Sequence, residues 1–319
     1  MGSTTGTFKK KVWDVRSKKD LVNAIYSKHK ISKTNIINMV GMVHSSYYRT
    51  PSFGKKGNTP SKLTYHKSRG WVNQDAVIAS IKEILSHEFI DCGYRLMTSY
   101  LKKEAYVINH KKLYRIMKEQ GMLKLENRIN RSGSGRKFVK FRKVNTSRPM
   151  ECLEMDIKMV WIPSVGKNAY LLSIIDVHTR RILKDYFSFS IKQDKVIAFL
   201  SELFVEYQYP NNVVIRSDNG SQFIANNVRE YLGLIGVQQE FTHIATPEEN
   251  AHIEAYHGIL KKEIFQRVDY QYFGQIEQIL KRYVTFYNNT RLHGLLGRIT
   301  PMEKWDADKH LILMKKLTA

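Results

Sequence analysis

Residues 151–177 read ECLEMDIKMVWIPSVGKNAYLLSIIDV, two apolar, β-rich runs on either side of a turn that contains Pro163 and Gly166. A third such run follows at residues 182–188. Short runs of this kind, bounded by turn residues, are typical of β-strands. Further along, helical and strand patterns alternate, with a helix near 196–207, a strand at 213–215, a helix near 228–234, a strand near 239–242 and helices around 248–267 and 275–288. This order predicts an α/β domain with a mixed five-stranded sheet flanked by helices.

The N-terminal part of the chain has helical spacing instead. Residues 19–48 predict two helices, a turn at Gly41 and a third helix, and residues 76–118 predict a second helical module. Between them, residues 51–70 are rich in Gly, Pro, Ser and Lys and poor in aliphatic side chains, which indicates a flexible linker. The sequence therefore predicts two all-α modules ahead of the α/β domain.

Charge is distributed unevenly along the chain. The whole sequence has 52 Lys and Arg against 29 Asp and Glu, a net charge of +23. Residues 1–150 hold 32 of the basic and 9 of the acidic residues, whereas residues 151–319 hold 20 of each. Because Lys and Arg contacts to phosphate dominate the affinity of nucleic-acid-binding modules, this asymmetry favours a DNA-binding half joined to a neutral half with another role. The alternative is a basic surface that serves solubility only.

The composition argues against several other classes of protein. No apolar run approaches the roughly 18 residues of a membrane span, and the N-terminus does not resemble a signal peptide, so neither a membrane nor a secreted protein is expected. The two cysteines, Cys92 and Cys152, lie far apart and form no CxxC pair, so we expect neither a disulfide framework nor a Cys-rich zinc module. A reducing, intracellular compartment fits best.

Two basic helices are candidates for DNA recognition. In a helix-turn-helix the second helix enters the major groove and presents Lys, Arg or small polar residues. Residues 45–49 fit this description, and so do residues 110–118 with Lys111, Lys112 and Arg115. Ordinary helical hairpins with solvated basic faces would give the same pattern. Residues 124–148, which include Arg136 and Lys137, predict a basic, flexible arm that becomes ordered on phosphate.

Three carboxylates are candidates for a catalytic site. Asp156 lies in the middle of the first predicted strand, where an unpaired carboxylate is costly without a cation. Asp218 follows the strand at 213–215, at a turn where sites gather in α/β sheets. Glu254 lies on a helix whose start, about two turns earlier, is marked by Thr246-Pro247-Glu248-Glu249. Two divalent cations held by such carboxylates would promote a phosphodiester displacement, although each residue taken singly is more readily explained as a helix cap, an ion-pair partner or a surface group.

The helix of Glu254 continues with cationic groups on the same face. His257, Lys261 and Lys262 follow Glu254 at helical spacing, where a DNA strand could pass, and Asn250 precedes it at the start of the helix. We therefore expect these four residues to contact DNA.

Together these motifs resemble those of a known family. The resemblance rests on Asp156, on Ser217-Asp218-Asn219-Gly220-Ser221-Gln222-Phe223 and on Asn250-Ala251-His252-Ile253-Glu254, with 35 residues between Asp218 and Glu254. The chain resembles the DDE transposases with a retroviral-integrase-like core that bacterial insertion sequences encode, most closely the OrfB-type subunit of the insertion-sequence-three family. Residues 93–117 are similar to that family's second helix-turn-helix, and residues 287–303 are similar to its C-terminal signature.

The resemblance implies an RNase H-like core in which Asp156, Asp218 and Glu254 hold two Mg²⁺ ions, which Mn²⁺ can replace, with Lys261 beside them. It implies cleavage of a DNA strand at an element end, then attack of the freed 3′-hydroxyl on a second phosphodiester, without a covalent protein–DNA bond. The implied partners are double-stranded DNA (terminal inverted repeats and target), further copies of the chain on that DNA, and a fusion partner from an upstream reading frame. The implied setting is the bacterial cytoplasm, at the nucleoid.

On this basis we expect six segments: an N-terminal helix-turn-helix (1–50), a linker (51–70), a second helix-turn-helix (71–123), a basic arm (124–149), the catalytic core (150–270) and a C-terminal helical extension (271–319). The alternative function is a catalytically inactive DNA-binding regulator or domesticated transposase, which would keep the basic half and lack the chemistry. A ribonuclease of the same fold would not need the two basic modules. For Asp176 we expect a turn-capping role, and for the stripe of Tyr283, Phe286 and Tyr287 a place in the core.

Overall fold

The computed structural model describes residues 14–29, 31–49, 61–123, 144–208, 210–243 and 247–312. The chain divides at residue 61 into two compact units, and each is described by itself. Within the described segments, no helix is both long and apolar enough to span a membrane.

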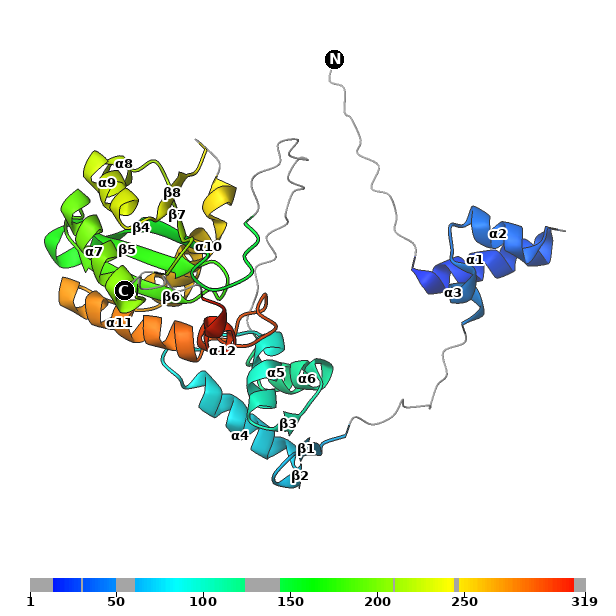
Figure 1. Cartoon of the computed structure of the whole chain (residues 1–319). Helices are drawn as coiled ribbons and strands as arrows, with labels where there is room; N and C mark the ends of the chain where they lie inside the picture. The colour runs from blue at the N-terminus through cyan, green and yellow to red at the C-terminus, as the bar shows by residue number, and fades with distance from the viewer. Residues whose placement is uncertain are drawn as a thin grey trace, which may run out of the picture. The chain divides into compact units, whose positions relative to one another are not determined.

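The first unit contains three short helices, drawn in blue in Figure 1: α1 (Val15–Lys28), α2 (Lys33–Met39) and α3 (His44–Tyr48). A small core of Val22, Ile36, Ile37 and Met42 holds them together. The turn between α2 and α3 passes through Gly41, whose φ of +61° is a conformation that glycine adopts without strain. This is the predicted order of helix, helix, turn and helix.

The second helical module opens the second unit and contains α4 (Gln74–Leu85), α5 (Tyr94–Lys103) and α6 (His110–Glu119). It also contains a small antiparallel sheet, in the order β2-β1-β3, formed by β1 (Thr64–His66), β2 (Gly70–Val72) and β3 (Tyr106–Val107). The module is therefore not all-α, and the linker predicted over residues 51–70 is wrong for residues 64–70. Residues 51–60 lie outside the described residues.

In the hairpin of β1 and β2, the side chains of β1 are alternately buried and exposed. A low content of aliphatic residues therefore does not exclude a strand here. Thr64 and His66 point inward, and the His66 ring packs edge-on against Tyr106 with centroids 4.7 Å apart. Gly70, with a φ of +72°, allows the chain to enter β2.

The α/β domain is built on a five-stranded sheet in the order β6-β5-β4-β7-β8. Its strands are β4 (Cys152–Ile162), β5 (Lys167–Asp176), β6 (Ile182–Ser188), β7 (Val214–Ser217) and β8 (Gln238–Phe241). The first three strands are antiparallel, whereas β7 and β8 run parallel to β4. The predicted mixed five-stranded sheet and its RNase H-like, α/β fold class are confirmed.

Helices cover both faces of this sheet (Figure 1). On one face α7 (Gln193–Glu206), α8 (Ser221–Ile224) and α9 (Asn226–Leu234) pack against Leu153 and Met155 of β4. On the other face α10 (Ala251–Leu260) and α11 (Phe273–Asn289) pack against Val160 and Ile162 of the same strand. Because successive strand residues point to opposite faces, a run of apolar residues serves both cores.

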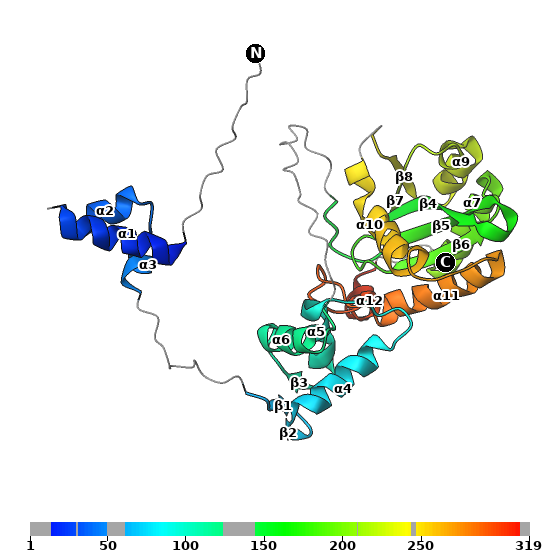
Figure 2. The ribbon, with the colours of Figure 1, turned by 180° about the vertical axis from the view of Figure 1, so that it is seen from behind.

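Helix α11, orange in Figure 2, joins the second helical module to the sheet. Phe89 of the module packs edge-on against Tyr283, with ring centroids 5.3 Å apart. Phe286 and Tyr287 are buried in the same cluster, so the aromatic stripe is core packing, as predicted. The chain continues into α12 (Pro301–Asp308), whose N-terminus is closed by a capping box of Thr300 and Glu303.

Candidate active site

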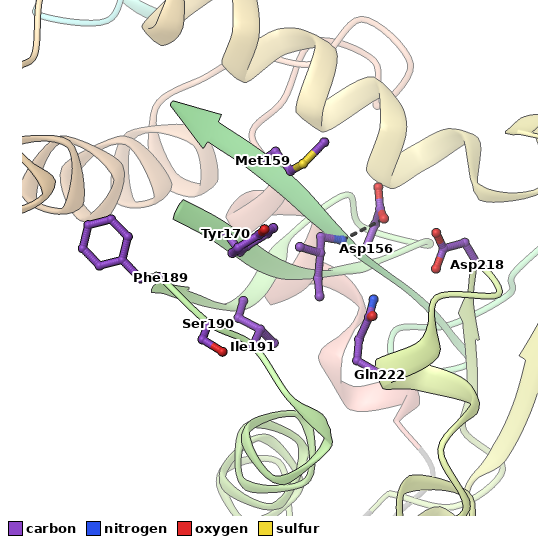
Figure 3. Close-up of a pocket in the computed structure, with 9 residues that line it drawn as sticks. Asp156, Met159, Tyr170, Phe189, Ser190, Ile191, Asp218 and Gln222 are labelled. Carbon is purple, nitrogen blue, oxygen red and sulfur yellow. Dashed lines mark hydrogen bonds between the residues drawn. The ribbon is translucent and has the colours of Figure 1, made fainter. Parts of the chain in front are cut away.

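The register of two parallel strands brings Asp156 and Asp218 to the same place. Met155 of β4 pairs with Ser217, the last residue of β7, so the next residue of each strand is one of the two aspartates. Neighbouring strands lie about 4.8 Å apart, which makes the two carboxylates neighbours at this end of the sheet. Both line one cavity of about 500 Å³, which Figure 3 shows with the aspartates at one end.

Each aspartate keeps only a few hydrogen bonds from the protein. Asp156 is half-buried, accepts a hydrogen bond from the backbone N–H of Ile157 at 2.7 Å, and lies 3.2 Å from Nδ1 of His257. Asp218 accepts one from the backbone N–H of Gly220 at 3.0 Å. Burial and, secondly, the nearby charge of Asp156 raise the pKa of Asp218 above its ordinary value. A cation in the cavity would relieve this unfavourable pairing.

Glu254 reaches the same neighbourhood from α10. His257, one helical turn after Glu254 on α10, lies 3.2 Å from Asp156, so this face of the helix is turned toward the aspartate. Burial and then the charges of Asp156 and Glu154 raise the pKa of Glu254. The α-helix begins at Ala251, and Glu254 lies in its first turn rather than two turns in. Residues Pro247–Asn250 form a 3₁₀ turn instead, and Thr246 lies outside the described residues.

A carboxylate on β4 replaces the local cap that the sequence predicted for this helix. Glu154 is fully buried, and it accepts hydrogen bonds from the backbone N–H groups of His252 at 2.8 Å and Ile253 at 2.9 Å. It also lies 2.6 Å from Nδ1 of His252. A negative charge that accepts the free N–H groups of a helix N-terminus is a favourable arrangement. Glu154 therefore fixes the start of α10, and with it Glu254, against the strand of Asp156.

The oxygen donors at the site suit a hard divalent cation. Mg²⁺ takes oxygen ligands and is usually held by one or two protein carboxylates, with water and substrate phosphate completing its shell. Asp156 and Asp218 meet this need on one cavity. Over the described ranges, no three His, Cys, Asp or Glu side chains are gathered closely enough to enclose an ion by themselves.

Comparison with known proteins finds family models that match the segments carrying this site. Family models described as "Integrase core domain" match residues 146–247 and 235–301, and one described as "HTH-like domain" matches residues 73–128. Residues 146–301 are therefore similar to integrase core domains. The two core matches together span all three candidate carboxylates, and the third match covers α4, α5 and α6.

Curated relatives of the chain are named for insertion sequences. A putative transposase InsK for element IS150 of Escherichia coli is 26% identical over 223 residues, covering 66% of this chain and 76% of the relative. A transposase for element IS904 of Lactococcus lactis is 24% identical and covers 74% and 96%, respectively. The resemblance deduced from the motifs is confirmed, and it supports a role in DNA transposition and integration.

Two solved structures align with the chain at low similarity. A simian T-cell lymphotropic virus intasome in complex with a PP2A regulatory subunit gives a TM-score of 0.43 at 11% identity, covering 72% of this chain and 73% of that chain. The catalytic core domain of BIV integrase gives a TM-score of 0.39 at 16% identity, covering 51% and 97%.

The residues expected to contact DNA near the integrase core fall into two groups. Lys261 and Lys262 are exposed on a π-helical turn, η3 (Lys261–Phe265), that continues α10. His257 and Asn250 are buried, so the expectation that they face DNA is not met. The His257 ring turns toward Asp156, and the Asn250 amide donates to the carbonyl of Met155 at 3.4 Å.

The basic residues of α6 also differ in exposure. Lys111 is exposed, and Arg115 is half-buried. Lys112 donates to the backbone carbonyl of Leu63 beside the β1–β2 hairpin, and burial, followed by repulsion from Arg115, lowers its pKa. Arg136 and Lys137 lie outside the described residues.

Several buried polar residues that tie neighbouring elements together were not expected from the sequence. Besides Glu154, the buried Arg216 on β7 pairs with Glu240 at 2.8 Å and donates to the carbonyl of Glu249 at 2.9 Å. Asn288 of the C-terminal signature exchanges two 2.9 Å hydrogen bonds with the backbone of Ile182. A charged residue inside an apolar strand was the available signal for Glu154 and Arg216, because such groups require partners.

Asp176 has the structural role that the sequence predicted. It is fully buried and accepts hydrogen bonds from Thr179, through both the backbone N–H at 2.7 Å and the hydroxyl at 2.6 Å. A third comes from the backbone N–H of Met150 at 2.9 Å. The turn between β5 and β6 is closed in this way.

Proposed function

We propose that the chain is a DNA strand transferase that cuts one strand at each end of an insertion sequence and joins the freed end to a second DNA site. The main support is the register of β4 and β7, which brings Asp156 and Asp218 to one cavity of a domain similar to integrase cores. Glu254 lies in the first turn of α10, and two relatives of the chain are transposases by name.

Asp156, Asp218 and Glu254 would hold the divalent metal, Mg²⁺ or, in its place, Mn²⁺. Their oxygen-only donor set fits such an ion. Burial, and after it the charge of neighbouring carboxylates, raises the pKa values of Asp218 and Glu254, and a bound ion would favour their charged forms. Divalent ions held by these residues would supply activation of the attacking oxygen and stabilisation of the leaving one.

The rest of the chemistry needs positioning rather than a protein nucleophile. In the first step water displaces one oxygen of the phosphodiester and leaves a free 3′-hydroxyl on the element end. In the second step that hydroxyl attacks a target phosphodiester and displaces the target's 3′-oxygen, so no covalent protein–DNA bond forms. His257 orients Asp156, and Glu154 holds α10 in register with β4.

DNA contacts would come from both halves of the chain. Lys261 and Lys262 are exposed on the turn that continues α10, and Lys111 and Arg115 lie on α6, the proposed recognition helix of the second module. The basic arm with Arg136 and Lys137 would grip phosphate. We further propose that several copies assemble on the terminal inverted repeats and target DNA, and that an upstream-frame fusion partner takes part. The segments expected from the sequence, other than the linker over residues 51–70, would be the functional divisions.

The test is an end-cleavage and joining assay on DNA that carries the natural flanks of the gene, with Mg²⁺, comparing the wild type with Glu254→Gln. We expect nicking at a defined end and strand joining by the wild type, and loss of both steps with retained DNA binding in the variant. Wild-type protein that binds the ends but never nicks them with Mg²⁺ or Mn²⁺, with or without the upstream fusion partner, would contradict the proposal and favour a DNA-binding regulator.

A further inference from the structure

The small sheet of the second helical module has an exposed apolar face. Trp71 on β2 is the cross-strand partner of Tyr65 on β1, and Tyr65 is the partner of Val107 on β3. Cross-strand partners lie side by side on the same face of a sheet. The three side chains are 68%, 41% and 56% exposed, respectively, and the rings of Tyr65 and Trp71 meet edge-on with centroids 5.5 Å apart. They form one continuous row, which we call the outer row.

The opposite face of the sheet packs on α4. His66 and Tyr106 are buried there, and the Tyr106 hydroxyl lies 2.9 Å from Oγ of Ser80 on α4. Since the two faces of a sheet point in opposite directions, the outer row is turned away from α4.

The exposed side of α6 is also turned away from α4. Leu113 and Ile116 of α6 are buried in the same cluster as Val77 of α4, whereas Lys111 and Lys118 are exposed. Residues on the side of a helix opposite to its buried stripe face outward. The outer row and the basic side of α6 therefore both face away from the core of the module.

The sheet is fixed beside the first turn of α6. Strand β3 leads into α6 through Asn109, whose side chain caps the helix by accepting from the backbone N–H of Lys111 at 2.8 Å. The Lys112 ammonium donates to the carbonyl of Leu63, the residue before β1. The N-terminal residues of a recognition helix are those that contact base edges in the major groove. The outer row thus lies next to the part of α6 that would enter the groove.

The charge around the outer row indicates the kind of partner. Residues 62–72 contain Lys62, Lys67 and Arg69 and no Asp or Glu, and all three cations are exposed. Arg69 also donates to the Tyr106 hydroxyl at 3.1 Å, which holds its guanidinium at the turn of the hairpin. An exposed apolar surface with a polar rim marks a binding site. A basic rim favours a polyanion over a second copy of the same surface, because two such copies would repel each other.

We infer that the outer row of Trp71, Tyr65 and Val107 binds the minor groove of DNA next to the major groove that α6 enters. β-Sheets bind DNA grooves in this way, and apolar side chains flanked by Lys and Arg are typical of minor-groove contacts. The inference rests on the proposed function, because it takes α6 as the recognition helix. It assigns DNA binding to a hairpin that the sequence alone predicted as part of a linker.

Two chemical footprints on the same DNA separate the contacts of the hairpin from those of α6. Dimethyl sulfate methylates N7 of guanine in the major groove, and hydroxyl radicals cut deoxyribose from the minor-groove side at every nucleotide. The full-length Glu254→Gln protein is bound to DNA that carries the natural flanks of the gene. We expect protected guanines at one major groove and protected sugars in the adjoining minor groove, within about five base pairs, half a helical turn.

Variants of the outer row should remove only one of these footprints. In the double variant Tyr65→Ala, Trp71→Ala, built in the same background, the adjoining sugars should lose protection while the guanines stay protected. The affinity should fall by roughly tenfold, the scale of losing one or two aromatic contacts to DNA. Trp71→Phe should keep the sugar protection, since an aromatic side chain remains. Lys111→Ala should have the converse effect and weaken the guanine protection.

A tryptophan on another sheet provides a matched control. Trp161 on β4 is 53% exposed, and Trp161→Ala should leave both footprints next to α6 unchanged. Thermal unfolding checks that every variant is folded, which we expect because the removed side chains are largely exposed.

Three outcomes would overturn the inference. The double variant could keep the sugar protection, it could lose the guanine protection together with the sugar protection, or Trp161→Ala could lose the sugar protection equally. Loss of both footprints would make the hairpin a support for α6, and a changed oligomeric state with intact footprints would assign the outer row to a protein contact. A wild-type chain that gives both footprints but never cuts DNA would contradict the proposed chemistry and leave this inference standing.

Discussion

Four carboxylates, two on β4, one at the end of β5 and one just after β7, differ sharply in their surroundings. Glu154 and Asp176 are fully buried, and each is met by three donors from backbone or side-chain groups. Asp156, only two residues from Glu154, lies at the cavity with one backbone donor and the His257 ring, and Asp218 has one backbone donor. The protein's own donors therefore satisfy Glu154 and Asp176, whereas Asp156 and Asp218 keep oxygen lone pairs available to a ligand.

The physical basis of this comparison is the cost of desolvation. A buried carboxylate without donors is strongly unfavourable, so Glu154 and Asp176 are saturated by the protein itself. Asp156 and Asp218 keep contact with solvent in the cavity and can exchange water for a cation. The number of hydrogen-bond donors around each carboxylate, rather than its position in the sequence, distinguishes the structural carboxylates from those at the site.

The largest expected effect is on catalysis at Asp156. Asp156→Asn should lower strand cleavage by at least about a thousandfold, because removal of one member disables a group of residues that acts as a unit. DNA affinity and thermal stability should change little, since few protein groups depend on this carboxylate. Parallel cleavage, binding and unfolding measurements check this, and a variant that still cuts DNA would end the assignment of Asp156 to the site.

Glu154→Gln should show the opposite profile. The amide has a similar shape but loses the charge that satisfies the N-terminus of α10 and His252, so we expect a loss of about 3 kcal/mol in the free energy of unfolding. Urea unfolding measures it, with Asp156→Asn as the control two residues away. If Glu154→Gln and Asp156→Asn lower the free energy of unfolding equally, Glu154 is no more important to the fold than Asp156, and the comparison is wrong.

Asp185 on β6 is a buried carboxylate whose effect on stability should depend on pH. Burial raises the pKa of Asp185 to about 6, and the charges of Lys281 and Lys184 only partly oppose this. Because the folded pKa lies above the unfolded one, the contribution of Asp185 to stability is present at low pH and is lost as the pH rises through about 6. Asp185→Asn should therefore be more stable than the wild type by about 1–2 kcal/mol at pH 7.5, allowing for partial exposure, and should match it near pH 4.

Urea unfolding of the wild type and Asp185→Asn across this pH range is the measurement. A difference that does not depend on pH would mean that the carboxylate keeps its ordinary pKa in the folded chain.

The smallest effect is expected at a carboxylate on the surface. Glu88 pairs with Arg282 of α11 at 2.6 Å, but both side chains are about half exposed. Exposed ion pairs typically contribute less than about 1 kcal/mol and are screened by salt. Glu88→Gln should lower the free energy of unfolding by no more than about 0.5 kcal/mol, and by less in 1 M salt. If it lowered the free energy of unfolding as much as Glu154→Gln does, the number of donors around a carboxylate would not explain its contribution to stability.

The sequence was sufficient for the framework of the integrase core. All five strands were predicted to within a few residues, because apolar runs bounded by turn residues are a local signal. The small sheet at residues 64–72 was missed, since its strands are only three residues long and rely on Tyr106, far along the chain. The start of α10 was misplaced because its cap is Glu154, which lies 98 residues before His252.

What the sequence determined by itself is the order of strands and helices, the segregation of basic charge in the first half, and the identity of three acidic residues with a recognisable spacing. What only the tertiary structure decided is the environment of each group. Glu154 and Asp156 point to the same face of β4 by strand alternation, and no local rule distinguishes them. The N-terminus of α10 docks on Glu154, and the end of β7 arrives beside Asp156. Contacts between residues so distant in the chain are fixed by packing of the whole domain, and they make one carboxylate a structural anchor and leave the other facing the cavity.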